Sequence, residues 1–250
     1  PPPPPRHSTK APDLEDPETP NTIAVEWFAQ HLLDSLNVLD LPPVDSGELM
    51  PHQKDTVGSI AGGCTAKLTL NHQEAAANVL AALATVMQWL TRADGSMVVG
   101  VEGSGPLLGD SVLESPMPIC VPFPSADAGS RTASPAGLAV EVGKIMREAI
   151  TVYDPKLVSL ANLAQRLGFG AMKNGAHHEI FQVLVAFEGP VGPKERPDME
   201  PLTRCPRRGC PKAAPLAMVL VVQAGAPKAG LKFRLTFSRR HMSQSIASSV

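Results

Sequence analysis

The fold is decided by residues 71–105, which read NHQEAAANVLAALATVMQWLTRADGSMVVGVEGSG. Apolar side chains recur here at the spacing of one helical face: Val79, Leu80, Leu83, Val86, Met87 and Leu90. Alanine, a strong helix former, fills many other positions and would let the helix lie close against a sheet. Asp94 and Gly95 have turn chemistry, and the apolar residues 97–101 then predict a short buried strand. The stretch therefore predicts a helix over 74–90 followed by a strand, which is the core unit of an α/β fold.

A glycine-rich loop follows the predicted strand, with Gly103, Ser104, Gly105 and Pro106 in succession. Glycine and proline at this density bend the backbone, and glycine allows a close approach to another group. A dinucleotide-binding loop would need a different glycine spacing and a helix that begins at the loop, and Pro106 and the leucines after it give no clear helix start. Ser104 has no base or acid partner that would make it a nucleophile. The sequence favours a loop that can approach a ligand or another lobe closely.

Composition sets outer limits on the function. The chain has 250 residues, of which 43% are apolar, so it can build a substantial core as one large domain or two small ones. A net charge of −2 gives no general attraction to nucleic acid or acidic lipid. The four cysteines are too few for a disulfide framework, no apolar run reaches the ~18–20 residues of a membrane span, and the start lacks the apolar core of a signal peptide. We expect a cytoplasmic protein with neither a nucleic-acid partner nor a membrane partner.

Further elements surround this unit. Residues 1–21 are proline-rich and charged, which predicts an extended linker within a larger protein. The remaining elements expected are helices over 22–37, 138–150 and 155–167, strands over 64–70, 116–124, 180–187, 216–223 and 231–238, and a long loop over 189–214. In the first helix, the residues expected to face the core are Ile23, Trp27, Leu36 and either His31 or Phe28. The last two strands form a hairpin, and the prolines of 116–124 predict an edge strand or an irregular one. The fold class is α/β, a mixed β-sheet with helices packed on one face, in one lobe over residues 22–250.

Several of these segments are similar, in order and spacing, to a known family. They are Glu26-Trp27 with Leu39-Asp40-Leu41-Pro42, the alanine- and leucine-rich run that leads into Val-Val-Gly at 98–100, VYDPKLVSLANLAQRLG at 152–168, HHEIFQVLVAFEG at 177–189, and the closing hairpin. This order resembles the C-terminal half of the condensation domains of nonribosomal peptide synthetases, which have a two-lobed fold like that of chloramphenicol acetyltransferase. The resemblance covers about residues 25–238.

The resemblance implies an activity as well as a fold. Condensation domains join carrier-protein-bound aminoacyl or peptidyl thioesters through an amide bond, in a tunnel between the two lobes. This chain would supply one wall of the tunnel and the lobe interface, near Gly100, Gly103, Ser104 and Gly105. The implied partners are the N-terminal lobe of the same domain and carrier proteins. Phosphopantetheine arrives on the carrier, so the chain itself is expected to need no cofactor.

The family's catalytic motif, two histidines followed after three residues by aspartate and glycine, belongs to the N-terminal lobe. His177 and His178 imitate its start, but Gln182 and Val183 stand where aspartate and glycine would be. Imidazole titrates near neutrality and could serve as a general base. Without an orienting carboxylate, however, we interpret the pair as structural, at the entry to a strand. No catalytic residue is assigned, and we expect the chain to be inactive alone.

Other candidate residues have simple interpretations. Asp154 is expected to cap a helix that begins at Pro155, because its carboxylate can accept backbone N–H bonds. Cys205 and Cys210 lack the spacing of a zinc knuckle, so no metal site is expected, and the pair is interpreted as surface thiols or an incidental disulfide. The basic run 204–208 indicates a solvated loop or a docking surface for an acidic carrier protein.

Two alternatives to the condensation activity stay open. The chain could be a degenerate, non-catalytic lobe that serves as a structural or interaction module of a multidomain synthetase. It could also belong to a related acyltransferase that uses a coenzyme A thioester. A histidine-histidine-aspartate-glycine motif upstream in the parent sequence would favour the enzyme over the non-catalytic lobe.

Overall fold

The computed structural model describes residues 20–33, 35, 57–64, 72–108, 111–127, 129–155, 158–168, 180–188, 216–224, 230–239, 242 and 247–248. The elements are α1 (Pro20–Leu33), β1 (Val57–Cys64), α2 (His72–Thr91), β2 (Ser96–Ser104), β3 (Val112–Pro122), α3 (Pro135–Val152), α4 (Leu160–Arg166), β4 (Val183–Glu188), β5 (Met218–Ala224) and β6 (Leu231–Ser238), with 3₁₀ turns η2 (Pro106–Leu108) and η3 (Arg131–Ala133).

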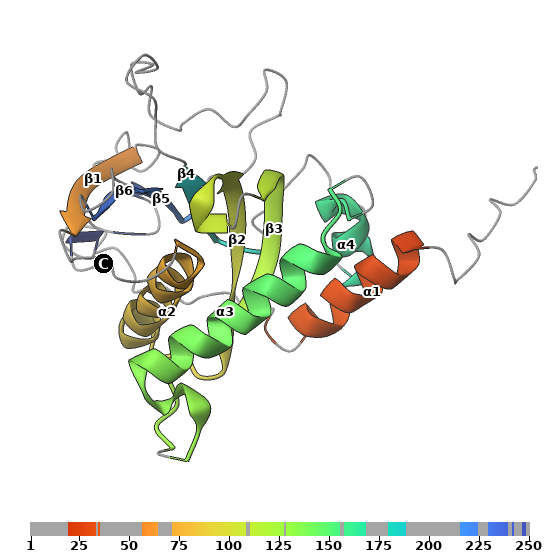
Figure 1. Ribbon diagram of the computed structural model, residues 1–250, viewed down its shortest axis with the longest axis horizontal. Helices are drawn as coiled ribbons and strands as arrows, with labels where there is room; N and C mark the ends of the chain where they lie inside the picture. Colours follow the sequence, from red (N-terminus) through yellow and green to blue (C-terminus); the bar gives the residue numbers. More distant parts are fainter. Residues whose placement is uncertain are drawn as a thin grey trace, which may run out of the picture.

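The six strands form one mixed sheet in the order β1-β6-β5-β4-β2-β3 (Figure 1). The central strands β2, β4 and β5 run parallel to one another, while β3, β6 and β1 pair antiparallel to their neighbours. The predicted closing hairpin is confirmed as β5 and β6, and the proline-containing strand β3 lies at an edge, as expected. The mixed α/β sheet predicted from the sequence is therefore confirmed.

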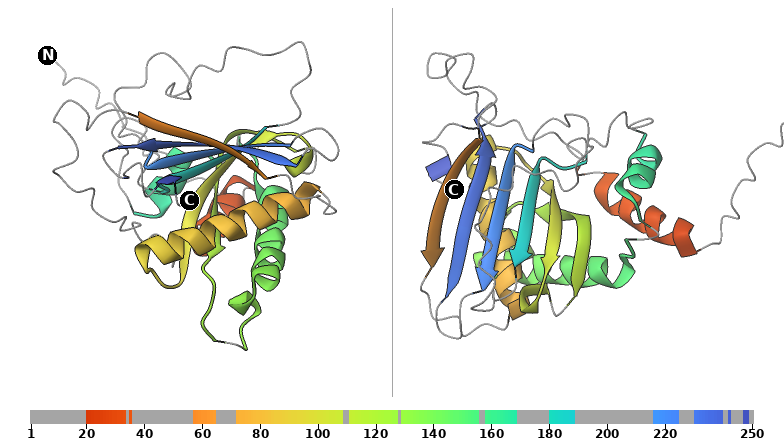
Figure 2. Two further views of the ribbon diagram at one scale, coloured as in Figure 1. Left: turned by 90° about the vertical axis from the view of Figure 1, so that its left-hand side faces the viewer. Right: turned by 90° about the horizontal axis from the view of Figure 1, so that it is seen from above.

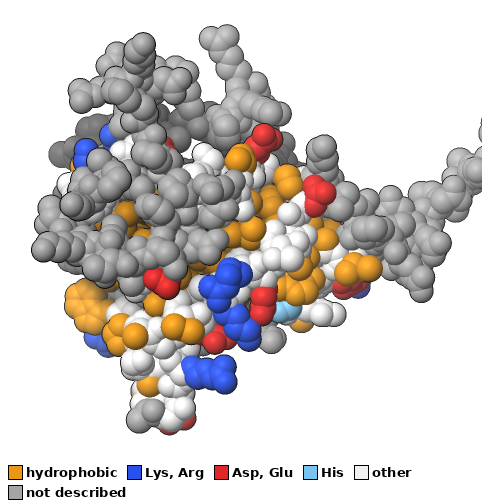
Figure 3. Space-filling model, viewed as in Figure 1, with side chains coloured by type: hydrophobic (Ala, Val, Ile, Leu, Met, Phe, Trp, Pro, Cys, Tyr) orange, Lys and Arg blue, Asp and Glu red, His pale blue; other side chains and the backbone are white. Residues whose placement is uncertain are grey.

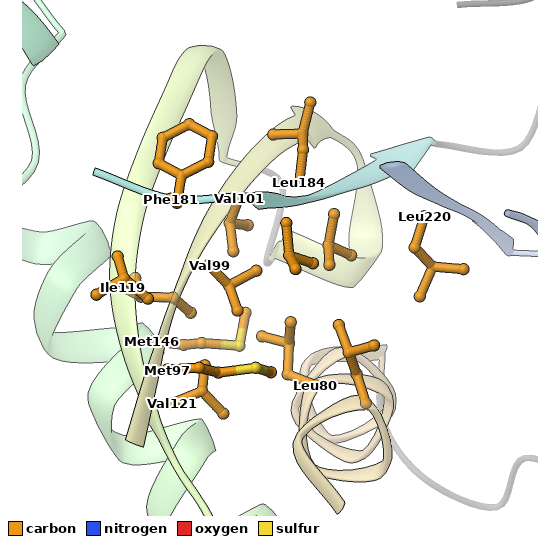
Figure 4. Close-up of a cluster of buried hydrophobic side chains, with 14 of the residues drawn as sticks. Leu80, Met97, Val99, Val101, Ile119, Val121, Met146, Phe181, Leu184 and Leu220 are labelled. Carbon is orange, nitrogen blue, oxygen red and sulfur yellow. The ribbon is translucent and has the colours of Figure 1, made fainter. Parts of the chain in front are cut away.

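Helices α2 and α3 cover one face of the sheet (Figure 2). The predicted helix over 74–90 lies within α2, and its side chains Leu80, Leu83 and Met87 are buried. Figure 4 shows Leu80 beside Met97 and below Val99 and Val101 of β2, whose side chains point toward the helix layer. On the opposite face lie Phe181 and Leu184. The core unit predicted from the opening stretch is thus the centre of the molecule.

Strand β1 corrects one boundary. A strand was predicted over 64–70 and a connection before it, but the strand runs over Val57–Cys64, and residues 65–70 lie outside the described residues. Its sequence VGSIAGGC is poor in strand-forming side chains. Pairing with β6 determines it instead, and Gly58 permits the pairing because a Cβ there would lie 2.2 Å from Cζ of Phe237. Long-range packing has overridden local propensity.

Helix α1 corrects a predicted face. The expected stripe is only partly right: Phe28 is buried and Trp27 packs partly against the core, but Ile23 is 63% exposed. The Trp27 ring also stacks on exposed His31, with ring centroids 3.9 Å apart. Leu36 lies outside the described residues. The buried face carries Ala24, Phe28 and Leu32, at intervals of four. Both stripes fit a helical period, and the one whose small Ala24 allows close packing is buried.

Helices α1 and α4 lie together beyond the β3 edge (Figure 1). Phe28 meets the ring of Tyr153 edge-on, with centroids 5.8 Å apart, and the Tyr153 hydroxyl donates a hydrogen bond to the carbonyl oxygen of Ser115 at 3.2 Å. Glu26 of α1 forms an ion pair with Arg166 of α4. The Tyr153 side chain therefore connects α1, the end of α3 and β3.

The outer side of α3 carries mixed charge. In Figure 3 basic and acidic side chains lie together over this helix. Lys144 Nζ lies 3.9 Å from Glu148 Oε1, one helical turn away, and about half of each side chain is exposed. An exposed pair of this kind contributes ~0.3–0.5 kcal/mol. This side of α3 is an ordinary solvated surface.

Replacing Leu83 should test the core position of α2. Leu83 is 3% exposed, so Leu83→Ala leaves a cavity and should lower the free energy of unfolding by about 2–5 kcal/mol. The matched change Leu33→Ala removes the same atoms from a side chain that is 61% exposed and should cost at most about 0.5 kcal/mol. Denaturant unfolding of both variants measures the difference; equal losses would mean that α2 is not a core helix.

Tyr153, the one tyrosine of the chain, should titrate late. Burial, and after it the negative charge of Asp154, raise its pKa to about 12. Because the pKa is higher in the folded state than in the unfolded state, the stability that Tyr153 contributes should be complete below pH ~10 and fall as the pH rises toward 12. Ultraviolet titration of tyrosinate in the folded protein should give the high midpoint, and Asp154→Asn should lower it. A midpoint near that of the unfolded chain would show an exposed ring.

Candidate functional site

The carboxyl ends of the parallel strands β2, β4 and β5 meet at one edge of the sheet. In open sheets of this type, ligands bind outside the carboxyl ends of the strands. The polar residues there are Ser104 on β2, Glu188 on β4 and Gln223 on β5. Gln223 donates a hydrogen bond from Nε2 to Oε2 of Glu188 across the two strands. This edge is the candidate site.

Gly103 brings the backbones of β2 and β4 together at this edge. Its φ is +118°, and a Cβ there would lie 1.9 Å from the carbonyl oxygen of Phe187. The register between β2 and β3 shifts between Val101 and Gly103, so an irregularity interrupts the pairing there. A residue with a side chain fits neither the φ nor the space. Local strand packing therefore explains the glycine.

The four residues predicted for the tunnel and lobe interface are only partly brought together. Gly103, exposed Ser104 and Gly105 (φ +101°) lie in succession at the carboxyl edge. Gly100 instead lies in the buried interior of β2, where a Cβ would be 2.5 Å from the ring of Phe181. Gly100 thus makes room for an aromatic ring. The role of the other three in a tunnel stays a prediction.

Glu102 is a polar residue that the sequence analysis missed. The register pairs it with Ala186, so its side chain shares the face opposite the helices with Leu184. Burial removes water from its carboxyl group and raises its pKa. The signal in the sequence was the single acid in the otherwise apolar strand MVVGVEGS. The sequence alone does not predict that Glu102 is buried, because the burial of that face depends on strands that are distant in the chain.

The capping role predicted for Asp154 is wrong. The helix expected from Pro155 begins at Leu160, and the hydroxyl of Ser159 caps it by accepting the N–H of Asn162 at 3.1 Å. The Asp154 carbonyl oxygen accepts the N–H of Val158 in a turn before the helix. Serine and aspartate are both good caps, and the turn decides between them.

The remaining candidate residues cannot be located in the described part of the chain. His177, His178, Cys205 and Cys210 lie outside the described residues. Within the described ranges, no group of three or more His, Cys, Asp or Glu side chains could hold a metal ion. None of the helices described is both long enough and apolar enough to cross a membrane.

Comparison with known proteins identifies the fold. No family model matches the sequence, and no curated protein matches it. Among solved structures, the chain is similar to the complex of the X-domain and OxyB from teicoplanin biosynthesis, with a TM-score of 0.61, 15% identity, and coverage of 93% of this chain and 51% of that one. It is also similar to the condensation domain of the Monacolin K polyketide synthase MokA, with a TM-score of 0.54, 12% identity, and coverage of 92% of this chain and 54% of that one.

A starter condensation domain of the rhizomide synthetase RzmA, in complex with C8-CoA and Leu-SNAC, matches with a TM-score of 0.53 and 10% identity, over 92% of this chain and 49% of that one. The chain therefore spans about half the length of the solved structures that it matches. Its fold is that of about half of a condensation domain, in agreement with the C-terminal half that the resemblance implies.

Gly103→Ala should destabilise the protein more than an otherwise similar glycine replacement. Gly95 also has positive φ (+89°), but a Cβ there would meet nothing within 4 Å. Gly95→Ala should therefore cost only about 1 kcal/mol of unfolding free energy, from the strained φ. Gly103→Ala adds the clash with Phe187 and should cost at least about 2–3 kcal/mol. Equal losses in denaturant unfolding would contradict the close approach of β2 and β4.

Proposed function

We propose that this chain is the C-terminal lobe of a condensation domain, which forms amide bonds between carrier-bound thioester and amine substrates. The observation that carries the proposal is the fold match over about nine-tenths of the chain and half of each condensation domain. The polar carboxyl edge of β2, β4 and β5 supports it, because that edge offers hydrogen-bonding groups on a rigid sheet.

In the proposed reaction, the nitrogen of the acceptor amine attacks the thioester carbonyl carbon, a C–N bond forms and the C–S bond breaks. The amine loses a proton and the leaving thiolate takes one up. The catalytic histidine motif would come from the N-terminal lobe, so this chain contributes binding and orientation. Carrier proteins would bring both substrates on phosphopantetheine, and no cofactor of the chain's own is proposed.

A non-catalytic interaction lobe is the second candidate. It is favoured by one neighbour, the X-domain, whose solved structure is a complex with a second protein, OxyB. A related acyltransferase that uses a coenzyme A thioester is the third, and the rhizomide neighbour with bound C8-CoA favours it. The proposals differ in what must be supplied: a thioester and an amine for the first and third, a partner protein alone for the second.

Activity should need more than this chain. The purified 250-residue chain, given a donor thioester and an acceptor amine, should form no amide product, whereas the intact parent protein should form it. Product formation is followed by mass spectrometry, with a coenzyme A thioester in a parallel reaction. An intact, folded parent that yields no product with either thioester would contradict the proposed activity and favour the interaction lobe.

The histidine pair gives a sharper form of this test. In the intact parent, His177→Ala combined with His178→Ala should leave measurable turnover, because the chemistry is assigned to the other lobe. A thousandfold loss, equivalent to about 4 kcal/mol of transition-state stabilisation, in a variant with unchanged melting would show that these histidines are catalytic.

A further inference from the structure

Glu102 occupies an unusual position in the sheet. It lies within the irregularity of the β2–β3 pairing between Val101 and Gly103, on the face opposite the helices, and its partner on β4 is the small Ala186. Phe181 lies over Gly100, two residues earlier on the same face, and closes the surface on that side. On this face Glu102 therefore lies between the Phe181 ring and the carboxyl edge of the sheet.

The carboxyl group of Glu102 has no hydrogen-bond or ion-pair partner within the described residues, in contrast to the carboxyl groups of Glu188 and Glu26. Glu188 accepts a hydrogen bond from Gln223, and Glu26 pairs with Arg166. A carboxylate that loses water without gaining a protein partner is destabilised. The cost is lower when an external group supplies the missing donors.

The charges around Glu102 select what that group can be. On β4 the nearest ionisable residue of the same face is Glu188, two residues beyond Ala186. On β3, Glu114 lies beside the irregularity in the β2–β3 pairing. The cations of that face, Lys232 and Arg234, lie on β6, with β4 and β5 between them and β2. Among the described residues of this face, the acids are thus nearest to Glu102 and the cations most distant. An anion would be repelled here, while an amine or another N–H donor would be attracted.

We propose that Glu102 is a specificity-determining residue that binds the N–H groups of the amine substrate. The proposal rests on the proposed function, from which it takes the identity of the amine as acceptor. Glu102 binds and orients the amine; it carries no proton in the reaction. The carboxyl ends of the parallel strands, where a ligand is expected to bind, are immediately adjacent.

Direct binding to the intact parent protein tests the proposal without catalysis. The probe is an alanyl-pantetheine amide, which cannot be cleaved as a thioester, and its counterpart is the same compound with an N-acetylated amine. Wild-type protein should bind the free amine at least about tenfold more tightly, the size expected for a hydrogen bond to a charged group. Glu102→Gln, which keeps the shape of the side chain, should abolish the preference.

Glu148→Gln is the matched control, since it makes the same chemical change at an exposed position on α3, which covers the other face of the sheet. It should keep the wild-type preference for the free amine.

The pH dependence of binding provides a second readout. A carboxylate accepts N–H bonds better than the neutral acid, so the wild-type preference should grow as the pH rises through the raised pKa of Glu102. In Glu102→Gln this dependence should be absent.

Equal binding of the two probes by wild-type protein, or an unchanged preference in folded Glu102→Gln, would overturn the assignment. Thermal melting shows whether each variant is folded. In the turnover assay, Glu102→Gln should raise the KM for the amine about tenfold with little change in kcat. If the wild-type parent prefers the free-amine probe but forms no amide product, the proposed function is contradicted and the amine site is supported. If Glu102→Gln leaves amide formation unchanged, the proposed function is supported and the role of Glu102 in binding the amine is contradicted.

Discussion

The burial of β2 on both faces is the constraint on which the rest of the structure depends. On one face Met97, Val99 and Val101 have no exposed surface beneath α2, and on the other Phe181 covers Gly100. A strand in this position has to be almost continuously apolar, and the helix against it benefits from small residues such as Ala84. The neighbouring parallel strand β4 is also buried and apolar from Val183 to Phe187. Together the two strands form a rigid base for the polar carboxyl edge.

Against this apolar background, the few polar groups of the central strands carry the information about function. Gln223 and Glu188 satisfy one another across β5 and β4, so that pair is explained by the sheet itself. Glu102 is not explained in this way, and a half-buried carboxyl in such a strand destabilises the folded state unless something else compensates it. Functional sites are where such local inconsistencies are expected in a folded protein.

The sequence predicted those parts of the fold that depend on local patterns. The helix over 74–90, the strand after it and the closing hairpin follow from periodicity and turn residues within a short window, and the structure confirms them. The glycine-rich strand β1, the buried face of α1 and the burial of Glu102 depend on partners that are distant in the chain. Asp154 was predicted to cap the helix, but Ser159 caps it, because a turn from Asp154 to Val158 precedes the helix and shifts its start to Leu160. Of the predicted glycines, Gly103 and Gly105 lie at the candidate edge, but the sequence analysis missed the acid beside them.

The pairing of β1 with β6 has a consequence for the order of events during synthesis. β1 lies at an edge of the sheet, so β6, the last strand of the described chain, is its sheet neighbour. On the ribosome β1 emerges early and remains unpaired until β6 has been made. An apolar, strongly strand-forming segment exposed for that time would invite pairing with other chains. The glycines of VGSIAGGC lower that tendency, so the weak strand propensity that hid β1 from sequence analysis protects the nascent chain.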